Sequence, residues 1–190
     1  MRKSKNVPRA DNQQERLGNY IAGFTDGEGS FNVSVKKRFD YKDKWKLTAS
    51  FNISQKDRVI LALIQKKLGC GTLRERKDGV VYYEVTDVAS LKGVIIPFFK
   101  RFGFLSSRKS TNFSIFSSIV EKMAEGDHLT DKGFRKILEL REILNEGKGR
   151  KRKYNLSDVF KGESSETIRK TVSNQIGRRR FENDDIVRSL

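Results

Sequence analysis

The stretch that decides the fold of this chain runs Leu17-Gly-Asn-Tyr-Ile-Ala-Gly-Phe-Thr-Asp-Gly-Glu-Gly-Ser-Phe31. Its apolar residues recur at the spacing of one helical face, which predicts an α-helix over residues 16–27: Leu17, Tyr20, Ile21 and Phe24. Gly23 and Gly27 share another face of that helix. A glycine inside a helix costs about 1 kcal/mol relative to alanine. The pair therefore indicates that a second backbone, such as another helix, comes close to this face.

Two segments after this helix, residues 31–38 and 46–54, alternate between apolar and polar side chains. This period of two predicts an antiparallel hairpin with one buried face, closed by a charged turn over residues 40–44. The outward positions are polar or basic: Ser30, Asn32, Ser34, Lys36 and Arg38, then Lys46, Thr48, Ser50, Asn52 and Ser54. These side-chain types contact phosphates and base edges, so we favour a DNA-reading surface over a plain solvated face.

The next elements predict a second helix and a second hairpin. Asp57 precedes a helical apolar stripe (Val59, Ile60, Leu63, Ile64 and Leu68) that stops at Gly69. Residues 71–77 and 80–86 then form a hairpin around Asp78-Gly79, a signal for a type I′ turn. Its outward positions add Arg74, Arg76, Tyr82 and Glu84 to the DNA-binding set.

The spacing of apolar residues predicts three more helices. The first starts at Ser90 and is disturbed by Pro97, and the other two cover residues 110–124 and 131–145. The predicted fold class is α+β: an αββαββα saddle with a four-stranded antiparallel DNA-binding sheet, plus C-terminal helices. We divide the chain into a disordered basic N-terminus (1–14), one domain (15–150) and a basic C-terminal extension (151–190).

Composition narrows the class of protein. Lys and Arg number 40 against 24 Asp and Glu, a net charge of +16, which favours a nucleic-acid partner. The single cysteine, Cys70, excludes a disulfide framework or zinc cluster within one chain. The sequence shows no signal peptide or membrane span, so we expect a soluble intracellular protein, in the cytoplasm or in a chloroplast or mitochondrion, with no membrane partner.

Ile21-Ala-Gly-Phe-Thr-Asp-Gly-Glu-Gly29 resembles the signature of the LAGLIDADG homing endonuclease family. Four other segments resemble parts of the family pattern: Phe51-Asn-Ile-Ser-Gln-Lys56, Gly71-Thr-Leu-Arg-Glu-Arg76, Pro97-Phe-Phe-Lys100 with Lys109-Ser-Thr-Asn-Phe113, and Ser164-Ser-Glu-Thr-Ile-Arg169. The resemblance implies a site-specific double-strand DNA homing endonuclease of the single-motif, homodimeric type, which is encoded within an intron and hydrolyses phosphodiester bonds with a divalent metal ion. It also implies a long, pseudo-palindromic DNA target.

The resemblance assigns roles to particular residues. It implies that Glu28 and Gly27 bind a metal ion, which is Mg²⁺ or Mn²⁺. It also implies that Glu28 and Gln55 are catalytic residues. The family's basic residue aligns near Ser107, so we assign that role to Lys109 and, second, to Arg108. The dimer interface is expected at Gly23, Gly27 and Asn19.

One metal-binding carboxylate per chain is too few for a two-metal nuclease. The resemblance implies a homodimer, which would bring two Glu28 side chains together. Asp26 is expected to support the helix end rather than to bind metal. The alternative functions are an RNA maturase, with intron RNA as a partner, or a non-cleaving DNA-binding regulator on the same fold. A ribosomal type of RNA-binding protein would explain the charge but not the helix with its two glycines and acidic tip.

Overall fold

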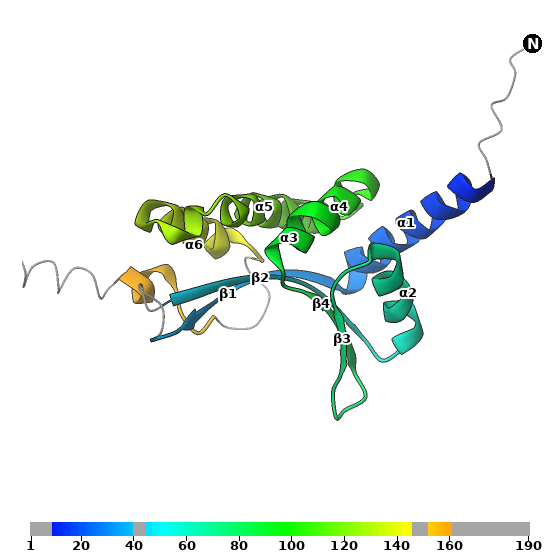
Figure 1. The fold of residues 1–190 in the computed structure, drawn as a ribbon, viewed down its shortest axis with the longest axis horizontal. Helices are drawn as coiled ribbons and strands as arrows, with labels where there is room; N and C mark the ends of the chain where they lie inside the picture. Colours follow the sequence, from blue (N-terminus) through cyan, green and yellow to red (C-terminus); the bar gives the residue numbers. More distant parts are fainter. Residues whose placement is uncertain (1–8, 40–44, 146–151, 161–190) are drawn as a thin grey trace, which may run out of the picture. The chain divides into compact units, whose positions relative to one another are not determined.

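The computed structural model describes residues 9–39, 45–145 and 152–160, which fall into two units within residues 1–150 and 151–190. Figure 1 shows the elements of the first unit: α1 (Arg9–Glu28), β1 (Gly29–Lys37), β2 (Trp45–Gln55), α2 (Arg58–Leu68), β3 (Thr72–Glu75), β4 (Val81–Val85), α3 (Val88–Ser90), the π-helix η1 (Leu91–Ile95), α4 (Ile96–Phe102), α5 (Ser107–Ala124), the 3₁₀ helix η2 (Asp127–Leu129) and α6 (Asp131–Ile143). In the second unit, residues 156–160 are helical. The expected turn at 40–44 and most of the extension lie outside the described residues.

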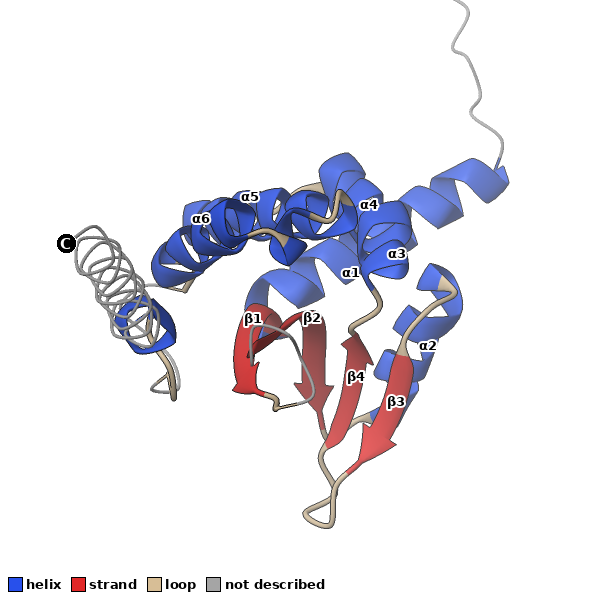
Figure 2. Ribbon diagram, turned by 60° about the vertical axis from the view of Figure 1, so that its left-hand side comes forward, coloured by secondary structure: helices blue, strands red, loops and turns tan. Residues whose placement is uncertain are grey.

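The four strands form one antiparallel sheet in the order β1-β2-β4-β3 (Figure 2). Helices α3 to α6 lie over one face of this sheet (Figure 1). The strand residues on that face are buried: Phe31, Val33, Val35, Leu47, Ala49, Phe51, Ile53, Val81, Tyr83 and Val85. The predicted α+β fold and the alternation of the first two strands are confirmed.

Phe31, three residues after the end of α1, is the centre of an aromatic cluster. Its ring centroid lies 5.0 Å from that of Phe116 and 5.3 Å from that of Phe51. The rings of Phe99, Phe104 and Phe113 lie within 6.0 Å of it as well. Each such pair contributes about 0.5–1.5 kcal/mol beyond the area it buries. The cluster holds the start of β1, and hence the end of α1, against α4 and α5.

Helix α1 begins earlier than expected, and it buries a different face. Residues 9–14, which we expected to be disordered, form its first turns, and Gln14 accepts a hydrogen bond from Lys67 of α2 at 3.4 Å. The buried positions are Gly18, Ile21, Ala22 and Thr25. The predicted stripe was wrong at Tyr20, which is 51% exposed and stacks on the half-buried Phe24.

Close packing explains why the small residues of α1 point inward. A Cβ at Gly18 would come within 2.1 Å of the Phe102 ring of α4, so only glycine lets the two helices approach this closely without a shift. Tyr20, which is much larger, is left on the exposed face. A helix with apolar residues on two sides gives no sequence signal for which side the chain itself will cover.

The second helix and its flanks follow the sequence in most respects. Asp57 caps α2 by accepting a hydrogen bond from the Val59 N–H at 2.8 Å, and Gly69 ends it in the left-handed conformation with φ 68°. The stripe expected to be buried on α2 was wrong at two positions, because Val59 is 78% and Leu63 is 42% exposed. The buried residues of α2 are Ile64 and Leu68, as predicted, and Leu61, which lay outside the predicted stripe.

The second hairpin forms as predicted, but its turn is of another type. A type I′ turn needs positive φ at both central residues. Here the Gly79 N–H donates to the Arg76 carbonyl at 3.0 Å, and Gly79 has φ 75° while Asp78 does not lie in the left-handed region. Asp78 instead accepts a hydrogen bond from the Val80 N–H at 3.2 Å, a bond within the turn. The connection is therefore a longer turn that ends on a left-handed glycine.

Two helix starts also differ from those expected. Asp87, rather than Ser90, caps the first turn by accepting a hydrogen bond from the Ser90 N–H at 2.8 Å. The helix then continues as the wider π-helix η1, which ends just before α4. Pro97, in the first turn of α4, has no N–H to donate. Helix α5 begins at Ser107, three residues before the expected start.

In the described part of the chain, no helix has the length and apolar character needed to cross a membrane.

Candidate active site and nucleic-acid interface

Glu28 is the last residue of α1, and β1 begins at the next residue without an intervening loop. Its side chain is exposed. The junction depends on Gly29, since a Cβ there would lie 2.4 Å from the Thr25 side chain and 2.7 Å from the Thr25 carbonyl oxygen. The direct join from helix to strand therefore fixes Glu28 at one end of the sheet.

Gln55 lies at the same end of the sheet. The register of β1 and β2 pairs Gly29 with Ile53, so the last two residues of β2, Ser54 and Gln55, continue past the start of β1 towards the end of α1. Gln55 is half-buried, and its Oε1 accepts a hydrogen bond from the Lys56 N–H at 2.9 Å. Two segments that are separate in the sequence thus bring Glu28 and Gln55 to one sheet end.

Lys109 reaches this junction from α5, where it is the third helical residue. Its Nζ donates a hydrogen bond to the carbonyl oxygen of Gly29, the neighbour of Glu28. Partial burial lowers the pKa of the Lys109 amine, although the carboxylates of Asp26 and Glu28 act in the opposite direction. Arg108, the second candidate for the basic role, is exposed at the start of α5, as is Ser107, the position near which the family's basic residue aligns.

Asp26 ties the end of α1 to the start of α5. Its Oδ2 accepts hydrogen bonds from the backbone N–H groups of Leu105 at 3.1 Å and Ser106 at 2.9 Å. Its Oδ1 accepts a third from the Ser106 hydroxyl. Burial raises the pKa of Asp26, but the bonds from Ser106 and Leu105 and the Lys109 charge outweigh that effect and leave the pKa below its ordinary value. Asp26 supports the helix end, as the sequence predicted.

The described residues contain no group of three or more His, Cys, Asp or Glu side chains that could hold a metal ion. At the junction, the Glu28 carboxylate faces solvent, while both oxygens of Asp26 are occupied by α5. Carboxylate and backbone carbonyl oxygens suit Mg²⁺, which keeps several of its waters and needs only one or two carboxylates. Glu28 with the Gly27 carbonyl therefore fits half of a metal site.

The outward polar residues of the first hairpin form cross-strand pairs on one face of the sheet. The register sets Ser30 opposite Asn52, Asn32 opposite Ser50, Ser34 opposite Thr48 and Lys36 opposite Lys46. None of these side chains is buried, and Arg38, just beyond β1, is exposed. Within this surface the Asn32 amide donates a hydrogen bond to the Ser30 hydroxyl at 2.9 Å, and the Ser34 hydroxyl donates to the Thr48 carbonyl at 3.5 Å.

The second hairpin extends this polar face. Glu84 of β4, one of the outward positions predicted for this hairpin, lies between Asn52 of β2 and Thr72 of β3. Arg74 forms an ion pair with Glu84, its diagonal neighbour. Next to it, Arg76 donates to the Tyr82 hydroxyl at 2.7 Å and pairs with Asp78 at 3.1 Å. Both arginines are thus held over the sheet face by partners on the same hairpin.

The expected dimer residues lie on the open side of α1. Asn19, Gly23 and Gly27 are exposed, and the half-exposed Tyr20 adjoins them. A Cβ at either of these glycines would meet no atom within 4 Å among the described residues. The close neighbour that the two glycines predict is therefore not supplied by the described part of this chain.

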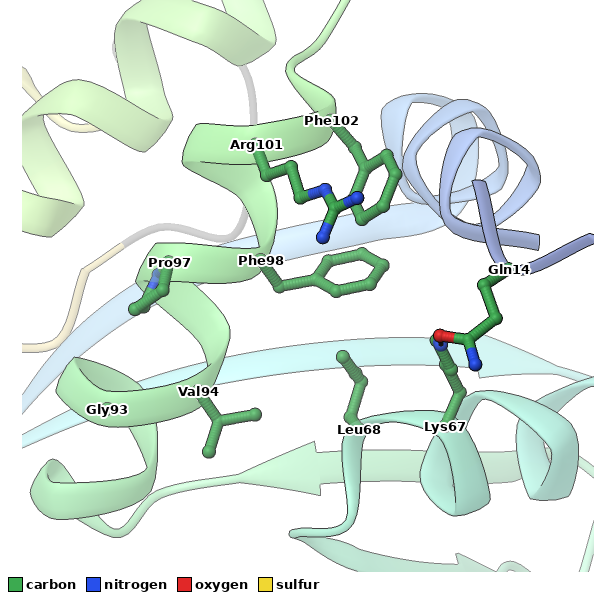
Figure 3. Close-up of a pocket in the computed structure, with 9 residues that line it drawn as sticks. All are labelled: Gln14, Lys67, Leu68, Gly93, Val94, Pro97, Phe98, Arg101 and Phe102. Carbon is green, nitrogen blue, oxygen red and sulfur yellow. Dashed lines mark hydrogen bonds between the residues drawn. The ribbon is translucent and has the colours of Figure 1, made fainter. Parts of the chain in front are cut away.

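A separate pocket of about 340 Å³ lies between α1, α2 and the η1–α4 segment. Figure 3 shows the rings of Phe98 and Phe102 and the cations Arg101 and Lys67 around it. Arg101 pairs with Glu15 at 3.6 Å, and Lys67 donates to Gln14. The pocket contains none of Glu28, Gln55 and Lys109, so it is distinct from the candidate active site.

The LAGLIDADG endonuclease family model matches residues 21–120, which include the whole α1–β1 junction, the sheet and the start of α5. This chain belongs to the LAGLIDADG endonuclease family. It is 39% identical over 132 residues to the probable intron-encoded endonuclease 2 of Neurospora crassa, covering 67% of this chain and 29% of that protein. The chain thus spans less than a third of the length of that relative.

Two solved structures share the fold. The archaeal intron-encoded homing endonuclease I-Vdi141I, complexed with DNA, has a TM-score of 0.73 and 30% identity, covering 78% of this chain and 94% of that chain. I-SmaMI, bound to an uncleaved DNA target in the presence of calcium ions, has a TM-score of 0.67 and 28% identity, covering 75% of this chain but only 48% of that chain. The unit described here therefore corresponds to nearly all of one chain and to about half of the other.

Proposed function

We propose that this chain is a site-specific double-strand DNA homing endonuclease, encoded within an intron, that hydrolyses phosphodiester bonds with a divalent metal ion. The observation that carries the proposal is the α1–β1 junction. An exposed acid, Glu28, lies there beside a partly buried amine, Lys109, at one end of a polar sheet face. The proposed metal is Mg²⁺, with Mn²⁺ as a substitute.

The junction residues suit phosphodiester hydrolysis. Glu28, with the Gly27 carbonyl, offers oxygen ligands to a metal ion, which when bound neutralises phosphate charge and activates water. An ammonium group has three N–H donors, so Lys109 retains two after bonding to Gly29, and these can stabilise negative charge on a phosphate oxygen. The amide of Gln55, at the same sheet end, can orient a water molecule through a hydrogen bond.

The proposed active form is a homodimer. Glu28 supplies one metal-binding carboxylate per chain, and the bare glycine face of α1 ends at that residue. Two such faces packed against each other would bring both Glu28 side chains to the dimer axis. The coverage of nearly all of I-Vdi141I and half of I-SmaMI supports a unit that works in pairs.

The proposed substrate is a long, pseudo-palindromic DNA duplex. A two-fold dimer reads two half-sites related by the same symmetry. Each sheet would contribute the paired side chains of the first hairpin together with Arg74, Arg76, Tyr82 and Glu84. The net charge of +16 strengthens binding to the phosphate backbone without selecting a sequence. We propose that the protein acts inside the cell, in the cytoplasm or an organelle that contains its target DNA.

Selection from a random DNA library tests the function. The protein is incubated with the library in Mg²⁺, and the cut ends are captured and sequenced; EDTA serves as the control. We expect double-strand cuts at related sites with approximate two-fold symmetry in Mg²⁺ and none in EDTA. Tight binding without cutting would contradict the proposal and favour a non-cleaving regulator, and selective binding of intron RNA alone would favour a maturase.

A further inference from the structure

Asp26, two residues before Glu28, is connected to Lys109 by a continuous set of hydrogen bonds. The Ser106 hydroxyl donates to Asp26 Oδ1, and the Ser106 Oγ in turn accepts a hydrogen bond from the backbone N–H of Lys109 at 3.4 Å. The Lys109 amine then donates to the Gly29 carbonyl. Since Asp26 and Gly29 flank Glu28 on the chain, these contacts close a ring around the α1–β1 junction.

Ser106 has a particular place in this ring, because it is the N-cap residue of α5. The direction of every side chain in the first turn of a helix depends on where that helix begins. A shift of one residue turns a helix by about 100° and moves it about 1.5 Å along its axis. Lys109, the third residue of α5, would then no longer point at Gly29.

Asp26 contacts the start of α5 through more than this hydroxyl. Its Oδ2 also accepts from the N–H groups of Leu105 and Ser106, so both carboxylate oxygens hold the segment that leads into the helix. These two residues are about eighty positions further along the chain. The contact therefore sets the position of α5 relative to the end of α1, which no local sequence preference can do.

We propose that Asp26 is a positioning residue: through Ser106 it fixes the start of α5 and so holds the Lys109 amine beside Glu28. The proposal rests on the endonuclease function proposed above for its effect on cleavage. The geometric part, that Asp26 determines where the Lys109 amine lies, is independent of any activity.

The test combines cleavage with lysine labelling. In single-turnover reactions on a duplex recovered from the library, Asp26→Ala should cut about 10- to 100-fold more slowly, the range for removing a partner that orients a site residue. Lys109→Ala should also be slow, and the double variant should be no slower than Lys109→Ala alone, because Asp26 acts through Lys109. Losses that multiply in the double variant would overturn the proposal.

Labelling with acetic anhydride, followed by mass spectrometry, reports on the amine directly. Asp26→Ala should increase the labelling rate of Lys109 but not that of Lys132, which is exposed on α6. Ser106→Ala should have the same effect, and Ser106→Thr, which keeps a capping hydroxyl, should restore the wild-type rate. Asp87→Ala, which removes the cap of α3, is the matched control and should leave Lys109 unaffected.

The outcomes separate the two proposals. Unchanged labelling of Lys109 in both Asp26→Ala and Ser106→Ala would overturn the positioning role, whatever the cleavage result. If Asp26→Ala fails to fold, which thermal unfolding detects, Ser106→Ala removes the hydroxyl link alone and decides the question. If the wild-type protein cuts no DNA but the labelling changes as expected, the positioning role stands and the endonuclease function fails.

Discussion

Two carboxylates in the last turn of α1 have different surroundings. Asp26 accepts three hydrogen bonds from the start of α5, while Glu28 is exposed at the tip of the helix. Carboxylates close together in the chain commonly divide their roles in this way, since surroundings determine what each can do. Both carboxylate oxygens of Asp26 accept hydrogen bonds from the chain itself, whereas the exposed carboxylate of Glu28 is left for the metal-binding role proposed above.

Glu28→Gln should bind the recovered DNA duplex with wild-type affinity but should not cut it in Mg²⁺. The amide keeps the size of the side chain but loses the charge that holds a divalent cation. Electrophoretic mobility shift measures binding, and gel analysis of the same mixtures measures cleavage. Glu139→Gln, an exposed acid on α6, is the control and should cut normally. Cleavage retained by Glu28→Gln would remove the basis of the proposed site.

At the scale of elements, side chains from α5, α6 and the residues after α6 cover the outer edge of β1. The carbonyl of Gly29 accepts from Lys109, that of Phe31 from Asn145 at 2.7 Å, and that of Val33 from Arg141 at 2.9 Å. Alternate carbonyls on this edge thus gain partners that no neighbouring strand in the described sheet supplies. Edge strands need such protection, because free backbone groups invite pairing with other chains.

Arg141→Met should lower the free energy of unfolding by about 1–3 kcal/mol, the cost of leaving a buried acceptor without its partner. Arg141 is only 4% exposed, and methionine retains much of its stem, so packing changes little. Urea unfolding followed by circular dichroism measures the effect. Lys132→Met, at an exposed position on the same helix, should stay within about 0.5 kcal/mol of wild type. Equal stabilities for the two variants would show that the edge contacts contribute little.

At the scale of the whole molecule, the open glycine face of α1 allows assembly to be tested separately from folding. Space around Gly23 and Gly27 is free of atoms from the described chain, so a side chain fits there without disturbing the monomer. In the proposed dimer the same space would be occupied by the second copy of α1. A bulky substitution should therefore affect assembly and leave the fold intact.

Gly27→Leu should give a folded monomer that cuts no DNA. Its thermal stability as a monomer should not suffer, because leucine favours a helix by nearly 1 kcal/mol over glycine. Size-exclusion chromatography with light scattering measures the assembly state. Gly93→Leu, at another exposed helical glycine with no atom within 4 Å, should remain dimeric. An active monomer of Gly27→Leu would contradict the homodimer model.

Local patterns in the sequence predicted most of the elements. The strict alternation in residues 31–38 and 46–54 predicted which strand residues are buried, and Asp57 and Gly69 mark the ends of α2 as expected. These features depend on residues within a few positions of one another, and period and capping are local properties of the backbone. The motif Ile21–Gly29 was sufficient to indicate the family.

Tertiary structure alone decided which face of α1 is buried and which residues meet at its end. The choice of Gly18 over Tyr20 for the interior depends on the fit against Phe102 of α4. The Asp26–Ser106 and Lys109–Gly29 contacts join residues about eighty positions apart, and Arg141 reaches Val33 across 108 positions. A single sequence carries no local signal for such contacts, because they form only when the helices pack on the sheet. The sequence by itself therefore determined the elements and the acidic tip at Glu28, and packing determined what surrounds that tip.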